Sequence, residues 1–302
     1  MWRSAILLCL AFVLPAAASA QENSREEAAR RAAQLSRLGP DAARRIFFEN
    51  NDPAPLAARA IGSYGRGCLA GAQALSPDGP TWQVMRLTRQ RNWGHPALIS
   101  WIERFARDAH SEGWPGLLVG DIAQSRGGPM LTGHASHQLG LEADLWLTPA
   151  RTRLSSEERE EMPAIDMVRR DLLSVYPDRF TDAHIKLLLR AASYPQVDRI
   201  FVNAAIKKAM CARTPPENRA WLAKIRPWHG HTFHFHVALH CPPGEESCVN
   251  KRATPQGEGC GAELQAWFRD SVRFPKPRAG APGRELTLAD YPEACRKVAV
   301  TR

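Results

Sequence analysis

The sequence predicts an α+β fold, in which a small central antiparallel sheet is surrounded by helices and long loops and held by disulfides. Helix-like and strand-like segments are mixed along the 302 residues without forming a regular βαβ series. Two segments alternate apolar and polar residues, as half-buried strands do, and others repeat apolar residues with a helical period. The hydrophobic content of 44% and the charged content of 24% are ordinary for a globular protein and exclude wholesale disorder.

The first twenty residues have the pattern of a secretory signal peptide. Arg3 is followed by an apolar run at 5–14 that is too short to span a bilayer, and residues 18–20 read Ala-Ser-Ala. We expect cleavage before Gln21, which leaves residues 21–302 as a single domain without a membrane anchor. The alternative is a retained signal anchor, which the cleavage pattern disfavours.

Helical periodicity and capping signals place the helices in order along the chain. Helices are expected at 24–38, where Ser24 and Glu27 have capping-box spacing, at 96–110, 155–175 and 181–192, from the end of a strand near 202 to about 212, and at 262–269. Strands are expected at 116–121, 141–147, 199–202 and 231–240. Glycine and proline predict loops at 52–68 and 127–133, and a loop-rich tail from about residue 270.

The net charge of +9, or +8 once Arg3 leaves with the signal peptide, predicts attraction to anionic polymers or membrane surfaces. Lysine and arginine do not form one block, and few aromatic residues lie among them. Nucleic-acid binding is therefore disfavoured.

Six cysteines remain after Cys9 is removed with the signal peptide. They are Cys68, Cys211, Cys241, Cys248, Cys260 and Cys295. An even number in an exported chain predicts three disulfides, and six cysteines allow 15 pairings. Cys241 and Cys248 flank a Pro-Pro-Gly turn and could close a local loop, whereas the spacing leaves the other pairings open.

Seven of the ten histidines fall in two clusters, at 134–137 and 229–240. On a strand, His234 and His236 share a face while the phenylalanines beside them face the core. Neighbours on one face are about 7 Å apart, so one imidazole can bind a metal while the next reaches a bound water. Trp228 and Phe233 are expected in the core or in the wall of a cleft.

In the first cluster, His137 and Asp144 can converge through a turn at Gly140. With His236 they make the three protein ligands that a catalytic zinc typically has. Either cluster alone fits a buried structural histidine or an adventitious surface site, but the two together favour a metal site. The remaining histidines are isolated and are expected to be structural. They are His95, His110 and His184.

The pattern His-x6-Asp followed by His-x-His resembles that of a group containing lysostaphin-type peptidases, D-Ala-D-Ala metallopeptidases and the hedgehog signalling domain. Over most of residues 60–270 the chain is identified as a member of the penicillin-insensitive murein endopeptidases. The stretches that carry this resemblance are IGSYGRGC at 61–68, GHASHQLGLEAD at 133–144, RIFVNAAIKKA at 199–209, RPWHGH at 226–231 and GCGAELQAWF at 259–268.

The resemblance implies a zinc ion held by His137, Asp144 and His236, with His234 as the catalytic base. His231 or His234 would return a proton to the leaving amine, although His231 could instead only line the cleft. A second set of metal-associated positions is matched by two further residues, His134 and Asp171. The third position of that set is usually histidine and is Ser174 here, which argues against a second metal. His134 could instead support a ligand, and Asp171 could be an exposed helix carboxylate.

The resemblance also implies the disulfides Cys68–Cys295, Cys211–Cys260 and Cys241–Cys248. It implies a periplasmic enzyme that hydrolyses the D-alanyl–meso-diaminopimelyl crosslinks of peptidoglycan without an acyl-serine intermediate. Three alternatives stay open. They are a D,D-carboxypeptidase, a non-hydrolytic peptidoglycan-binding protein stabilised by zinc, and a basic exported module that binds anionic polymers.

Overall fold

The fold is known from a computed structural model that describes residues 26, 28–253, 256–276 and 284–301. The predicted signal peptide and the capping pair Ser24 and Glu27 lie outside the described residues. Residues 28–35 are helical, as expected. None of the described helices is both long enough and apolar enough to cross a membrane.

A six-stranded mixed sheet forms the centre of the molecule. Its strands lie in the order β4 (Trp82–Val84), β6 (Leu117–Val119), β7 (Glu142–Trp146), β10 (His234–Leu239), β8 (Val197–Val202) and β9 (Ile225–Pro227). The three central pairings are antiparallel, and the two edge pairings, β4 with β6 and β8 with β9, are parallel. The α+β class is confirmed, but the sheet differs from the expected antiparallel one at both edges. These edge strands are three residues long, which is too short for periodicity to detect.

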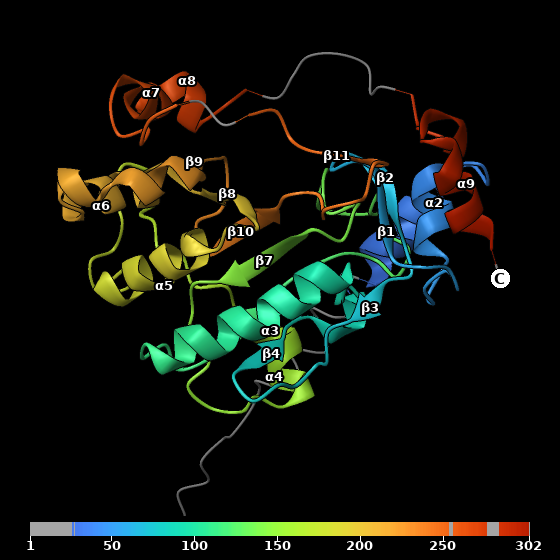
Figure 1. Ribbon diagram of the computed structural model, residues 1–302, viewed down its shortest axis with the longest axis horizontal. Helices are drawn as coiled ribbons and strands as arrows, with labels where there is room; N and C mark the ends of the chain where they lie inside the picture. Colours follow the sequence, from blue (N-terminus) through green and yellow to red (C-terminus); the bar gives the residue numbers. More distant parts are fainter. Residues whose placement is uncertain (1–25, 27, 254–255, 277–283, 302) are drawn as a thin grey trace, which may run out of the picture.

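One face of the sheet is apolar and packs against two helices, α3 (Pro96–Ser111) and α5 (Asp182–Ser193), which lie next to each other (Figure 1). Phe235 and Val237 of β10 are completely buried in this core. The ring of Phe105 on α3 meets that of Phe235 edge-on, with 6.3 Å between centroids. The predicted alternation along β10 therefore holds, and the polar side chains of β7 and β10 lie on the opposite face.

A second, three-stranded sheet covers one end of that opposite face. It consists of β11 (Cys248–Val249), β1 (Arg59–Ser63) and β2 (Arg66–Ala70). Ala60 and Tyr64 from this region pack against Ala238 of β10. A two-stranded pair is formed by β3 (Gln73–Ala74) and β5 (Trp93–Gly94).

The hairpin of β1 and β2 corrects the prediction of a loop at 52–68. Glycines in this segment allow close strand contacts instead of breaking the strands. Gly62 has φ +90°, and a Cβ atom at Gly67 would lie 2.4 Å from a side-chain carbon of Leu139. Glycine is needed at both positions because a side chain would be strained at the first and would clash at the second.

The predicted helix at 155–175 is wrong after its first turns. The helix α4 spans only Ser156–Glu161 and begins with a capping box between Ser155 and Glu158. Pro163 follows directly after Met162 and disfavours a helical conformation there. The remaining helices are α2 (Ala43–Phe48), α6 (Ala204–Arg213), α7 (Ala262–Gln265), α8 (Asp270–Arg273) and α9 (Glu293–Val300).

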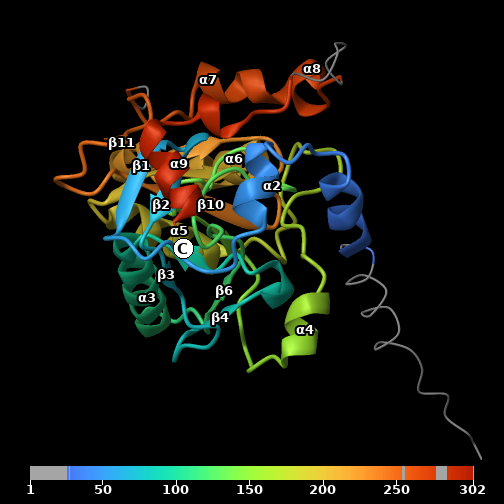
Figure 2. The ribbon, with the colours of Figure 1, turned by 90° about the vertical axis from the view of Figure 1, so that its right-hand side faces the viewer.

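Three disulfides are present, two between distant parts of the chain and one across a local loop, with the pairings that the resemblance implied. They are Cys68–Cys295, Cys211–Cys260 and Cys241–Cys248. The first joins β2 to α9. The helix α9 packs against α2, although the two helices are far apart in the sequence (Figures 1 and 2). The segment after residue 270 was expected to be loop, but it contains α8 and α9. A native disulfide stabilises a domain by roughly 2–4 kcal/mol.

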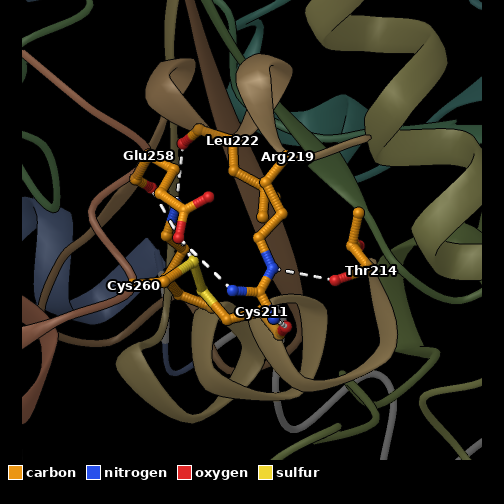
Figure 3. The surroundings of a disulfide bond; sticks show 7 residues. Cys211, Thr214, Arg219, Leu222, Glu258 and Cys260 are labelled. Atoms are coloured by element: carbon orange, nitrogen blue, oxygen red, sulfur yellow. Dashed lines mark hydrogen bonds and ion pairs between the residues drawn. A yellow bond between two sulfur atoms is a disulfide. The ribbon is translucent and has the colours of Figure 1, made fainter. Parts of the chain in front are cut away.

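Hydrogen bonds reinforce the disulfide between α6 and Cys260 (Figure 3). The guanidinium of Arg219 donates to the carbonyl oxygens of Thr214 and Cys211, at 2.8 and 2.5 Å, and to the Glu258 carboxylate at 3.3 Å. One arginine thus links the end of α6 to the segment that carries Cys260. Removing it would leave these acceptors without their donor.

Candidate active site

The polar face of β7 and β10 brings the predicted site residues together. His236 pairs with Asp144 in the antiparallel register, so their side chains project from the same face. Asp144 and His236 are buried, at 6% and 5% exposure. The alternation of each strand, combined with this register, places both groups side by side.

His137 reaches the same point from the loop before β7. Its backbone is left-handed, with φ +66°, and its side chain is completely buried. Its backbone N–H donates to the Glu142 carboxylate at 2.6 Å, which holds the loop against β7. Gly140 makes the predicted turn, with φ +65°.

Three donor atoms from these residues converge. His137 Nε2 lies 3.1 Å from His236 Nδ1 and 3.5 Å from Asp144 Oδ1, and the last two atoms are 3.1 Å apart. Ligands at the usual zinc distances of 2.0–2.1 Å in tetrahedral geometry are about 3.3 Å from one another. His137, Asp144 and a further neighbour, His134, likewise form a group whose ligand atoms all lie within 4.8 Å of one another. The residues present therefore fit a metal ion.

Each imidazole forms a hydrogen bond through its other nitrogen, which leaves His137 Nε2 and His236 Nδ1 free to bind a metal ion. His137 Nδ1 lies 2.7 Å from the carbonyl oxygen of Ile122, to which it can only donate. His236 Nε2 lies 3.0 Å from the Glu142 carboxylate. In the neutral imidazoles, His137 Nε2 and His236 Nδ1 then each present a lone pair. Two lone pairs and a carboxylate oxygen facing one another require a cation or a proton between them.

The close approach of these ionisable groups shifts their pKa values. Burial would lower the pKa of His236, but the charge of Glu142 and the hydrogen bonds to Asp144 and Glu142 outweigh it and raise the pKa to about 9. Burial would raise the pKa of Asp144, but the charges of His234 and His137 hold it well below its usual value. Both shifts favour a positive charge between the carboxylates of Glu142 and Asp144.

Glu142 holds the backbone of His137 and the imidazole of His236, and it was missed from the sequence. Its carboxylate is completely buried and accepts from His137, His236 and Lys251, the last at 2.8 Å. Carboxylates of this kind orient metal-binding histidines and fix their tautomers. The signal was present, since Glu142 precedes Asp144 by two positions and therefore shares its strand face. Nothing in the sequence indicated Lys251.

His134 lies at the other side of Asp144. Its Nδ1 is 3.6 Å from Asp144 Oδ2, while its Nε2 is 2.9 Å from Asp121 Oδ2. The same Asp121 oxygen accepts from Arg91 at 2.8 Å and from Arg89 at 3.2 Å. Burial lowers the pKa of His134, but the bond to Asp121 and the nearby carboxylates raise it overall. Asp121 is a second residue that the sequence did not single out, although it is the last residue of the predicted strand at 116–121.

The two histidines assigned to acid and base chemistry lie beside the cluster. His234 begins β10, and its Nε2 lies 3.7 Å from Asp144 Oδ1. His231 precedes the strand in a left-handed conformation, with φ +51°, and its ring centroid is 4.8 Å from that of His234. Burial lowers the pKa of both, that of His231 to about 4 with help from the charge of His234. The predicted strand at 231–240 thus starts three residues later than expected.

Two of the second set of metal-associated positions, Asp171 and Ser174, lie at the surface. Asp171 is exposed, and its carboxylate accepts the backbone N–H of Leu173 at 2.9 Å. Ser174 is also exposed. Within the described part of the chain, no hydrogen bond or ion pair joins Asp171 or Ser174 to His134.

The isolated histidines serve the fold. His95 caps α3 by accepting the N–H of Ala97, and His184 Nε2 lies 3.0 Å from the Leu147 carbonyl oxygen. His110 Nδ1 lies 3.2 Å from the carbonyl oxygen of Trp114. All three positions agree with the structural roles that were expected.

A cluster of histidines and a carboxylate on one face of a sheet is typical of metal-dependent hydrolases. Comparison with known proteins narrows this class to the peptidases. The chain belongs to the penicillin-insensitive murein endopeptidase family, whose model matches residues 60–300.

Relatives that carry the name penicillin-insensitive murein endopeptidase match most of the chain. The protein of Haemophilus influenzae is 43% identical over 238 residues, which cover 79% of this chain and 81% of the relative. That of Salmonella arizonae is 40% identical over 244 residues, covering 81% and 87%. That of Klebsiella pneumoniae is 39% identical over 239 residues, covering 79% and 85%.

Proposed function

We propose that this protein is a zinc-dependent endopeptidase that hydrolyses D-alanyl–meso-diaminopimelyl crosslinks in peptidoglycan. We place it in the periplasm, after removal of residues 1–20. The observation that carries the proposal is the convergence of three donor atoms within 3.1–3.5 Å, with a further imidazole beside them. Membership of a murein endopeptidase family supports the choice of substrate.

His137, Asp144 and His236 would hold the metal, through Nε2, Oδ1 and Nδ1 respectively. Two nitrogens and one carboxylate oxygen are a common ligand set of catalytic zinc, which keeps a fourth position for water or substrate. A bound zinc ion supplies a Lewis acid and lowers the pKa of coordinated water to about 7. Glu142 and the carbonyl of Ile122 keep the two imidazoles in the tautomers that this binding needs.

His234 accepts a proton from the water that attacks the amide carbonyl. It lies on the same strand face as His236, with Nε2 3.7 Å from Asp144 Oδ1, and is therefore next to the three proposed metal ligands. The protonated imidazole of His234 then donates to the leaving amine, and His231 is the neighbouring group that can share this step. No serine or cysteine belongs to the cluster described here, so the proposed chemistry needs no acyl-enzyme.

We propose one metal per chain. His134 is hydrogen-bonded to Asp121, and Asp171 lies on an exposed segment beside Ser174. His134 is then a positioning residue, which holds Asp144 through its second oxygen.

Digestion of purified crosslinked muropeptide dimers, with and without a zinc chelator, tests this function. Mass spectrometry should show chelator-sensitive conversion of dimers to monomers that keep their terminal D-alanine. Loss of a single alanine would instead indicate a carboxypeptidase. An unchanged mass with zinc bound would identify a binding protein without hydrolytic activity.

A further inference from the structure

Two tryptophans line a small cavity next to the histidine cluster. Trp228 follows β9 and is 53% exposed, which is unusual for so large an apolar side chain. Trp267 lies in a short 3-10 helix, η4 (Ala266–Phe268), and its ring centroid is 6.4 Å from that of Trp228. The cavity between them has a volume of about 240 Å³. Trp228 was expected in the core or in the wall of a cleft, and it lies in the wall of this cavity.

This cavity adjoins the candidate active site. The ring of Phe201 lies 5.6 Å from Trp228 on one side and 5.5 Å from His236 on the other. Asn203 fixes the loop between the two regions, because its backbone N–H donates to the His231 carbonyl at 3.1 Å and its side chain to that of Gly230 at 2.9 Å. The ring of Phe201 therefore separates a ligand that packs on Trp228 from His236, one of the proposed metal ligands.

Polar groups surround the indole faces. The imidazole of His229 lies 5.1 Å from Trp267, is exposed, and makes no hydrogen bond through its ring nitrogens to any other described residue. Arg273 also lines the cavity. The volume is below the roughly 300 Å³ of the smallest pockets that enclose a whole drug-sized ligand. It suits a single ring that has one apolar face and hydrogen-bonding groups at its edge.

A pyranose ring has this character, since its C–H groups form an apolar face and its hydroxyl and acetamido groups project from the edge. An apolar peptide side chain could pack on the indole faces but could not bond the ring nitrogens of His229, whereas the hydroxyl and acetamido groups of a sugar can. The large flat surface of an indole provides contact area with little loss of conformational entropy.

We propose that Trp228, Trp267 and His229 form a subsite for an N-acetylated sugar ring of the glycan strand. The subsite holds the strand while a peptide crosslink attached to it lies at His234 and His236. The inference rests on the proposed function for its substrate, but the binding of sugar can be measured without catalysis.

The first test is calorimetric binding of peptide-free glycan strands, which an amidase releases from peptidoglycan. Wild type should bind them, and Trp228→Ala should weaken binding about tenfold, as expected for the loss of one aromatic contact. Trp228→Phe should retain part of the affinity. Leu189→Ala removes an apolar side chain of similar exposure (42%) from α5, outside the cavity, and should bind as wild type does. Absence of binding by wild type, or equal binding by Trp228→Ala, would overturn the subsite.

The second test compares crosslinked dimers that carry their disaccharides with dimers from which the sugars have been removed. Trp228→Ala should raise KM about tenfold for the first substrate, with kcat unchanged, and should leave KM for the second unchanged. An equal rise for both would overturn the inference while leaving the proposed function intact. If wild type cleaves neither dimer, the proposed function fails, and the binding measurement alone decides the sugar subsite.

Discussion

His137 Nε2 and His236 Nδ1 lie 3.1 Å apart, although 99 residues separate them in the sequence. The hydrogen bonds on the far side of both rings direct a lone pair of each nitrogen toward the other. Such a pair repels unless a cation or a proton lies between the rings. The contact therefore explains the chemistry of the site more directly than its sequence motif does.

His236→Ala should lose zinc and hydrolytic activity together, because it removes one of three proposed ligands. Zinc content per chain and dimer hydrolysis are the measurements. His240→Ala is the matched control, because that side chain follows the same strand and is half exposed. Stoichiometric zinc in the His236 variant would remove this residue from the ligand set.

His234→Ala should keep its zinc and lose turnover by a factor of roughly 10²–10⁴, the usual contribution of a general base. Zinc content per chain and kcat for dimer hydrolysis show whether the variant keeps its metal while losing turnover. Near wild-type turnover would show that another group accepts the proton.

Glu142→Gln should weaken zinc binding by about 10–100-fold, as substitutions next to metal-bound histidines typically do. The amide keeps the size of the side chain but loses the charge that His236 and Lys251 face. Competition with a chromogenic chelator measures the affinity. An unchanged affinity would mean that the Glu142 carboxylate does not tune the ligands.

Asp171→Asn should leave zinc content at one ion per chain, because the carboxylate bonds the backbone of Leu173 and lies on an exposed segment. Metal analysis after saturation with zinc and removal of the excess gives this number. Two ions in wild type and one in the variant would establish a second site at Asp171.

Lys207 makes stability depend on pH. Its side chain is completely buried on α6, and its amine donates to the carbonyl oxygens of Leu222 and Glu258 at 2.7 and 2.5 Å. Burial, and then the charge of Arg226, lower the pKa of Lys207 from 10.5 to about 7. Between these values the unfolded chain binds a proton that the folded chain does not, so the free energy of unfolding rises with pH.

This rise should be about 2 kcal/mol between pH 7 and pH 9. Denaturant titrations of wild type and Lys207→Met at both pH values measure it, because the difference between the two proteins isolates this amine from other titrating groups. The variant should lose the rise. Equal pH dependence in the two proteins would contradict the lowered pKa.

The strands that carry the site could be predicted because their apolar and polar residues alternate. Phe235 and Val237 face the core and His234 and His236 face away, as the pattern required. The pattern could not give the parallel edge strands, which are only three residues long. It also failed at 155–175, where Pro163 ends a short helix that periodicity alone would have continued.

The supporting groups of the site were harder to predict. Lys251 and Asp121 come from segments that the chain folds back against the cluster, and only tertiary structure joins them to Glu142 and His134. The contact between Trp228 and Trp267 was equally hidden, because 39 positions separate the two residues in the sequence.

The most direct test of the central claim is a crystal structure of the zinc-loaded protein, with anomalous scattering at the zinc edge to locate the ion. The account predicts one ion, bound by His137 Nε2, Asp144 Oδ1 and His236 Nδ1 at about 2.0–2.2 Å, with an open position facing His234. An ion bound between His134 and Asp121, or none at this cluster, would contradict it.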